Sequence, residues 1–240
     1  MPGVEAIFLD IDDTLYPTSE FAHKARINSI KAMIDMGLKD VTPEQCMEEL
    51  QEVIDEFGSN YDHHYDLLLR RLPKKSFEEI NPVLIIAAGV IAYHKTKKHL
   101  LAPYEDVSQF LQKISKSNIL LGVITAGIPN KQAEKLIRLE LVKYFDPRFI
   151  FISDQIGIGK SNPKLYKYTC QSVNIDPRLC INIGNNPLTD IDPANSIGMT
   201  TVLVRKGEKY KLKGKTSPCY TISDMQELLK ILKKDYRLHF

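Results

Sequence analysis

The chain has 240 residues, of which 43% are hydrophobic and 26% charged, and its formal net charge at pH 7 is +2. This length is enough for a sizeable core in one large domain or two small ones, and the near-neutral charge argues neither for nor against a nucleic-acid partner. The cysteines Cys46, Cys170, Cys180 and Cys219 form no C-x-x-C pair and no metal-ligand spacing. We therefore expect reduced, mostly buried thiols in a cytoplasmic protein.

The N-terminus leads directly into a predicted strand, without a charged n-region or a cleavage site. The longest apolar run, Val83 to Tyr93, is too short to span a bilayer. These features predict a cytoplasmic chain without a membrane partner.

The first predicted element is an apolar strand, residues 4–9, which ends in the carboxylates Asp10, Asp12 and Asp13. An apolar run of this length suits a strand buried on both faces, and ligands of open α/β sheets bind at the carboxyl ends of strands. Three acids within four residues repel one another, and the i, i+2 spacing of Asp10 and Asp12 lets them share a hard cation such as Mg²⁺. The alternative is a strand end followed by an acidic, helix-capping turn.

Residues 17–99 are predicted to be helical throughout. Apolar spacing and capping residues place helices from Thr18 to Gly37, from the capping box at Thr42 to Gly58, over 62–72, and over 81–98. This insertion is much longer than an ordinary crossover and has its own apolar faces, so we expect a small helical domain. Taken singly, its Tyr, His and Arg side chains are expected to be solvated. The alternative is that, as a group, they line a cleft that faces the acidic strand end.

Residues 100–240 alternate between helices and strands. We expect strands at 119–124, 149–152, 179–183 and 200–204, and helices at 107–114, 129–141 and 163–173, near Pro193 with Asp190 or Asp192 as cap, and from a capping box at Ser223. Repeated β-α units imply a mainly parallel, doubly wound, Rossmann-like sheet with right-handed crossovers. The predicted fold is therefore α/β, with a core of residues 1–16 and 100–240 and a helical insertion at 17–99.

The stretch from Arg205 to Lys215 contains six Lys or Arg residues. A solvated loop is the interpretation we favour over a nucleic-acid patch, and such a loop would steer anionic substrates if it bordered the cleft.

Three later loops carry residues suited to phosphate or metal binding. The residues Thr125, Ala126 and Gly127 end a predicted strand and precede a helix. There the Thr125 hydroxyl and the N–H groups of Ala126 and Gly127 can hold phosphate oxygens. Lys160 lies in a glycine-bearing loop, and Gly184 to Asp190 follows another strand. Taken singly, these features are an ordinary strand-to-helix turn, a surface lysine and an N-cap.

Together, in this order and each at a strand end, they resemble the haloacid dehalogenase-like phosphatase superfamily over nearly the whole chain. The resemblance implies that Asp10 attacks phosphorus and that Asp12 protonates the leaving alcohol and then activates water. It also implies that the helical insertion is a cap that closes over the site, excludes water and chooses the substrate. The implied phosphate-binding residues are Thr125, Ala126, Gly127 and Lys160, and the implied Mg²⁺ ligands are Asp10, Asp12, Asn185 and Asp190.

Two positions depart from the superfamily pattern. Gly184-Asn185-Asn186 stands where Gly-Asp is usual, so Mg²⁺ affinity should be weaker and activity could be reduced or lost. Lys160-Ser161-Asn162-Pro163 stands where Lys-Pro-x-Pro is common, which should loosen the turn while keeping the lysine.

The cap and the Asp-Asp-Thr-Leu-Tyr run look most like archaeal phosphatases assigned to glyceraldehyde 3-phosphate, although pyrimidine nucleotidases have a similar start. We predict a Mg²⁺-dependent phosphatase for a small phosphorylated metabolite, monomeric or homodimeric, with no nucleic-acid partner. A haloacid dehalogenase is the first alternative, against which Asp12 and Asp13 argue, and a metal-impaired binding module is the second, which only Asn185 favours. A receiver-type phosphoacceptor domain would not carry the long insertion.

Overall fold

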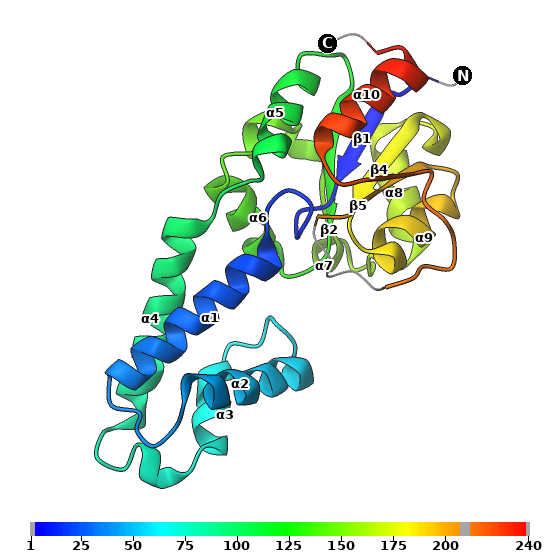
Figure 1. Cartoon of the computed structure of the whole chain (residues 1–240). Coiled ribbons are helices and arrows are strands. Elements are labelled where there is room, and N and C mark those ends of the chain that lie inside the picture. Colours follow the sequence, from blue (N-terminus) through cyan, green and yellow to red (C-terminus); the bar gives the residue numbers. More distant parts are fainter. Residues whose placement is uncertain (1–2, 207–211, 239–240) are drawn as a thin grey trace. The chain divides into compact units, whose positions relative to one another are not determined.

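The computed structural model describes residues 3–206 and 212–238 of the chain (Figure 1). The chain divides into two compact units, Met1–Pro17 with Ala102–Phe240 and Thr18–Leu101. Within the first unit, the backbone N–H of Tyr104 donates a hydrogen bond of 3.0 Å to the Leu15 carbonyl. This bond joins the two segments of the first unit that flank the inserted unit.

The first unit is built on a six-stranded parallel sheet in the order β3-β2-β1-β4-β5-β6. This topology confirms the predicted doubly wound α/β class. The edge strand β6 is not predicted from the sequence, because its three residues carry no apolar run. The strands are β1 (Ala6–Leu9), β2 (Leu120–Thr125), β3 (Ile150–Ile152), β4 (Cys180–Gly184), β5 (Thr200–Val204) and β6 (Tyr220–Ile222).

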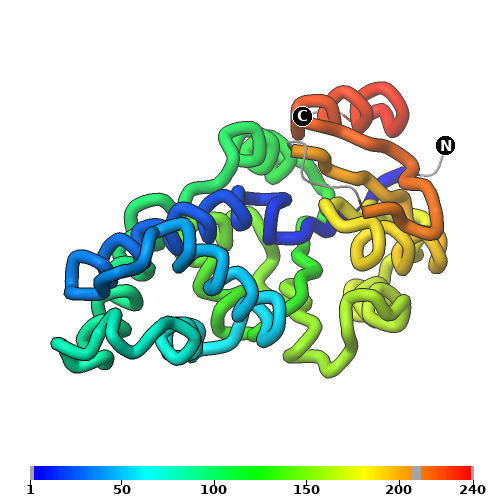
Figure 2. Tube along the Cα trace, turned by 60° about the horizontal axis from the view of Figure 1, so that its bottom comes forward, coloured from blue at the N-terminus to red at the C-terminus, as the bar shows by residue number. Residues whose placement is uncertain are grey.

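Helices cover both faces of this sheet. Figure 2 shows α5 (Glu105–Ile114) and α10 (Met225–Tyr236) on one side, where they pack together, and α8 (Pro163–Val173) and α9 (Asp192–Asn195) on the other. Phe8 of β1 and Tyr166 of α8 are fully buried in the core beneath the second pair. Burial on both faces explains why the inner strands are mainly apolar. The remaining helical segments of this unit are α6 (Pro129–Arg138), α7 (Ser153–Ile156), η2 (Val142–Tyr144), η3 (Pro147–Phe149), η4 (Pro177–Leu179) and the π-helix η5 (Pro187–Ile191).

The caps predicted for α9 and α10 are wrong. Helix α9 has no side-chain cap: Asp190 lies in η5, and Asp192 is the first helical residue, whose carboxylate accepts the N–H groups of residues 215 and 216 at 2.8 Å. Helix α10 is capped by Asp224, while the Ser223 hydroxyl donates to Glu227 at 2.7 Å. In both cases a carboxylate finds a partner that the local pattern does not specify.

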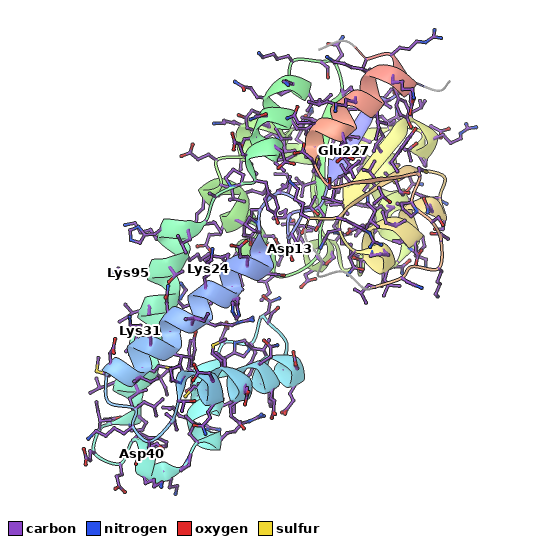
Figure 3. All side chains as sticks on the ribbon, in the orientation of Figure 1. Asp13, Lys24, Lys31, Asp40, Lys95 and Glu227 are labelled. Carbon is purple, nitrogen blue, oxygen red and sulfur yellow. The ribbon has the colours of Figure 1, made fainter. Side chains whose placement is uncertain are left out.

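The second unit consists of α1 (Thr18–Asp35), α2 (Pro43–Phe57), α3 (His64–Arg71), the short η1 (Lys74–Ser76) and α4 (Pro82–Leu100). Helices α1 and α4 pack along each other, and the capping box predicted at Thr42 is confirmed. Charged side chains such as Lys24 and Lys31 of α1 and Lys95 of α4 are exposed (Figure 3). Among the helices of the described residues, none combines the length and the apolar character needed to cross a bilayer. The core of this second unit contains Ile30, Met33, Leu38, Cys46, Leu50, Ile54, Leu68, Leu69, Leu72 and Ile85.

The four cysteines are free thiols, three of them buried and Cys219 exposed. Of the basic stretch, residues 207–211 lie outside the described residues. Lys206 is paired with Asp106 and lies over the ring of Tyr104 at 4.0 Å, so this lysine packs against the start of α5.

Candidate active site

The candidate site lies at the carboxyl edge of three neighbouring strands, β2, β1 and β4 (Figure 1). Asp10 follows β1 directly, and its backbone N–H donates to the carbonyl of Ile183 in β4 at 2.9 Å. Thr125 is the last residue of β2, and Gly184 is the last of β4. The parallel register therefore gathers three of the predicted segments at one edge.

Lys160 joins two buried carboxylates at this edge. Its Nζ donates to Asp10 Oδ1 at 2.5 Å and lies 2.6 Å from Asp190 Oδ1. The three residues are only 1–6% exposed. Gly184 permits this arrangement, because a Cβ at that position would lie 2.2 Å from Asp190 Cγ. Asp10, Lys160 and Asp190, predicted separately, thus form one ion network.

Burial dominates the electrostatics of this network. It raises the pKa of Asp10 to about 7, against the lowering effect of the Lys160 charge and with a further rise from Asp190 and Asp12. Burial lowers the pKa of Lys160, but the charges of Asp10 and Asp190 outweigh it and hold that pKa above its ordinary value. Two carboxylates facing one ammonium leave a net negative charge in a desolvated site when both are ionised.

The loop that carries Lys160 is closed despite its departure from Lys-Pro-x-Pro. The Asn162 side chain caps α8 by accepting the N–H of Lys164 at 3.0 Å, and the Asn162 N–H donates to the Gly159 carbonyl at 2.9 Å. An asparagine cap followed by Pro163 thus fixes the turn that precedes the helix.

The segment that carries Asp190 is held by two buried side chains that the sequence analysis did not single out. The Tyr166 hydroxyl donates to the Thr189 carbonyl at 2.5 Å, and Asn182 Nδ2 donates to the Asp190 carbonyl at 2.9 Å. The N–H of Asn186 completes the arrangement by donating to Asp190 Oδ2 at 2.8 Å. These bonds position a carboxylate within a π-helix, where sequence periodicity gives no guide.

The donors around the network suit a hard cation. Asn185 directly follows β4 and is buried, with its Oδ1 3.5 Å from the Thr14 hydroxyl. The two carboxylates, with the amide oxygen of Asn185 and the backbone carbonyl of Asp12 that the family resemblance implies, would make an oxygen-only set of the kind that Mg²⁺ prefers. Across residues 3–206 and 212–238, no cluster of three or more His, Cys, Asp or Glu is placed to hold a metal. A Mg²⁺ ion here would therefore depend on the amide and backbone oxygens and on water, and the residual negative charge fits such an ion.

The turn after β2 offers unused hydrogen-bonding capacity. Thr125 Oγ1 is buried and has no hydrogen-bond partner among the described residues. Gly127 follows with a φ of +117°, a conformation that favours glycine, and its N–H donates to Ser153 Oγ at 3.4 Å. An unpaired buried hydroxyl is costly, so its position at the strand end suits a ligand oxygen.

Asp12 is placed apart from the ion network, against helix α6. Lys135 Nζ lies 2.6 and 2.8 Å from its two carboxylate oxygens, and Gln132 Nε2 donates to Oδ2 at 3.1 Å. The Tyr16 hydroxyl donates to Oδ1 at 3.1 Å. The structure thus brings Asp10, Lys160 and Asp190 into direct contact and gives Asp12 its own set of partners.

Gln132 and Lys135 are two further residues that the sequence analysis missed. Their i, i+3 spacing on a helix that directly follows the Thr125 turn places them on one helical face. That spacing was visible in the sequence, but the face that turns toward Asp12 was not.

The model of the haloacid dehalogenase-like hydrolase family matches residues 7–204. The chain is 39% identical to glyceraldehyde 3-phosphate phosphatase of Methanopyrus kandleri, covering 96% of this chain and 98% of the relative. It is 38% identical to the protein of that name from Pyrococcus furiosus, covering 98% and 95%. The crystal structure of a phosphatase of this superfamily from Thermococcus onnurineus superposes with a TM-score of 0.65 at 21% identity, covering 95% of this chain and 98% of that one. This last likeness concerns the fold alone.

Proposed function

The chain belongs to the haloacid dehalogenase-like hydrolase family and is a phosphatase, and we propose that it hydrolyses small phosphomonoesters with Mg²⁺ through an aspartyl-phosphate. The observation that carries this proposal is the network of Asp10, Lys160 and Asp190, at the same sheet edge as the unpaired hydroxyl of Thr125. A buried nucleophile, a fixed positive charge and an unused donor are what phosphoryl transfer requires.

The phosphoryl oxygens would be bound by the turn after β2 and by Lys160. Thr125 supplies the hydroxyl, Ala126 and Gly127 supply backbone N–H groups, and Lys160 supplies a charged donor beside the nucleophile. Preorganised donors of this kind stabilise the charge of the transferring group.

In the first step, an Asp10 oxygen attacks phosphorus, and the bond from phosphorus to the leaving oxygen breaks as Asp12 donates a proton to that oxygen. In the second step, water attacks the phosphorus and gives a proton to Asp12, and the bond to Asp10 breaks. Inorganic phosphate leaves, and both carboxyl groups return to their starting states.

Asp10, Asp190, Asn185 Oδ1 and the Asp12 carbonyl would hold Mg²⁺, which would offset the negative charge of the phosphoryl group and the carboxylates. The helical unit would be the cap domain that selects the substrate. We propose glyceraldehyde 3-phosphate as that substrate, because two relatives at 38–39% identity carry this activity in their names.

The test is phosphate release from p-nitrophenyl phosphate, glyceraldehyde 3-phosphate, phosphoserine and a pyrimidine nucleoside monophosphate, each with millimolar Mg²⁺ and with EDTA. We expect Mg²⁺-dependent release, fastest from glyceraldehyde 3-phosphate, and a loss of at least about 1,000-fold in Asp10→Asn. Unchanged release by Asp10→Asn would refute the mechanism, and a preference for the nucleotide would refute the substrate.

Asn185→Asp should be measured in parallel. Activity in the wild type means that Asn185 serves in the site, whereas activity in Asn185→Asp alone would identify a metal-impaired chain and overturn the proposal for the natural protein.

A further inference from the structure

Helix α6 holds the proposed acid, Asp12, through two side chains. Lys135 contributes the ion pair at 2.6 Å, and Gln132 contributes a hydrogen bond at 3.1 Å to the second carboxylate oxygen. Lys135 is 17% exposed at its side chain and Asp12 is 32% exposed, so both keep contact with solvent. Gln132 is 4% exposed and reaches Asp12 from the interior.

Gln132 also contacts the phosphate-binding turn. Its Nε2 donates to the Ala126 carbonyl at 2.7 Å, so one amide group bonds both this turn and the carboxylate of Asp12. The contact is tight, because a Cβ at Gly127 would lie 2.9 Å from Nε2. The amide nitrogen therefore bridges the two parts of the site that the proposed reaction must bring together.

Stability alone does not account for the presence of a glutamine at position 132. Its Oε1 is buried without a hydrogen-bond partner among the described residues. An unpaired buried acceptor costs about 1–3 kcal/mol, which an apolar residue of the same size would avoid. The amide makes sense where both N–H groups are needed.

We propose that Gln132 is a positioning residue, which fixes the carboxylate of Asp12 relative to the Thr125–Gly127 turn so that the acid meets the leaving oxygen. This inference rests on the proposed function. A general acid must lie within about 2.6–3.2 Å of the oxygen that it protonates, and the bound phosphoryl group sets where that oxygen lies. A planar amide bonded to both partners sets this spacing more tightly than the flexible stem of Lys135 can.

The chemistry provides a readout that a purely structural role would not move. Phenolate is a stronger base than p-nitrophenolate, so its departure depends more on proton donation. Misplacing the acid should therefore slow transfer from phenyl phosphate more than transfer from p-nitrophenyl phosphate. The ratio of kcat/KM for the two esters isolates this effect, because kcat/KM covers the steps up to formation of the phosphorylated Asp10.

The experiment compares wild type with Gln132→Met and Gln132→Glu in the full chain at saturating Mg²⁺. Methionine keeps the length and removes both donors, while glutamate keeps the shape and replaces both donors with acceptors. We expect the kcat/KM ratio of p-nitrophenyl to phenyl phosphate to rise at least about tenfold in each folded variant, since general acid catalysis contributes 10²–10⁴-fold. Inhibition by inorganic phosphate should change less than about threefold, because Thr125 and Lys160 are intact.

Gln171→Met is the matched control, an exposed glutamine on α8 whose ratio should not change. An equal loss with both esters in Gln132→Met and Gln132→Glu would overturn the positioning role and leave the proposed function standing. Failure of the wild type to hydrolyse these esters and glyceraldehyde 3-phosphate alike would refute the proposed function itself, and this inference with it.

Discussion

Replacing Lys160 with methionine tests the ion network directly, because Lys160 is the only cation that the described contacts give to Asp10. Methionine keeps much of the side-chain length and leaves Asp10 and Asp190 facing each other without the ammonium. Removing one partner of a buried ion pair typically costs about 3–5 kcal/mol of unfolding free energy. We expect a loss of this size in metal-free protein at pH 9.

The loss should depend on pH in a defined direction. With Lys160 present the folded-state pKa of Asp10 is about 7, above the ordinary value of 3.8, so the folded state retains a proton that the unfolded state releases. Metal-free wild type should therefore lose stability as pH rises from about 4 to about 7. Without Lys160, which lowers the pKa of Asp10, that pKa moves above 7. The difference between wild type and variant should then grow above pH 7 by up to about 1.4 kcal/mol per pH unit.

The assay is urea unfolding in EDTA at pH 6, 7, 8 and 9, followed by far-UV circular dichroism. Lys167→Met, an exposed lysine on α8, serves as the control and should change stability by less than about 0.5 kcal/mol. A Lys160→Met loss below about 1 kcal/mol, or one that does not vary with pH, would refute the network as described.

Three further outcomes follow from the geometry. Thr125→Val should leave the unfolding free energy within about 1 kcal/mol of wild type, because Oγ1 has no partner to lose, yet weaken inorganic phosphate binding about tenfold or more by calorimetry. Gly184→Ala should lower stability in urea by about 1–3 kcal/mol through its collision with Asp190, whereas Gly159→Ala, whose Cβ meets no atom within 4 Å, should not. Chelation with EDTA should leave the far-UV spectrum unchanged, because Lys160 already pairs with both carboxylates; a loss of helix signal would contradict this.

Most of the fold could be predicted from the sequence, because apolar runs and capping residues specify individual strands and helices, and burial in the core stabilises the same elements. The apolar runs of β1 and β2, the capping box at Thr42 and the asparagine before Pro82 each specify their own element. The strand that was missed, β6, and the caps that were misassigned at Asp192 and Ser223 depend on partners distant in sequence or on competition between adjacent polar residues.

The candidate site likewise contains residues that the sequence predicts and others that only the structure reveals. Asp10, Thr125 and Lys160 can be predicted because they lie at strand ends or in a glycine-bearing loop. A parallel sheet then brings such strand ends together. Gln132 and Tyr166 lie within ordinary helical stretches, and only the packing of α6 and α8 turns them toward Asp12 and the Asp190 segment. Residues that support a site from a neighbouring helix carry no motif of their own, which is why they emerge only from the structure.

Asn185 has a physical interpretation in this setting. It is 8% exposed, and a carboxylate there would place a third buried acid near Asp10 and Asp190, with Lys160 as the shared cation. Repulsion among three buried carboxylates would destabilise the metal-free protein, while the added charge would strengthen Mg²⁺ binding. We therefore expect Asn185→Asp to bind Mg²⁺ more tightly than wild type by calorimetry. In EDTA the variant should unfold at a lower urea concentration than wild type, and at saturating Mg²⁺ this difference in stability should shrink or reverse. If Asn185→Asp were equally stable in EDTA, the amide would not be relieving charge repulsion, and its presence would need another cause.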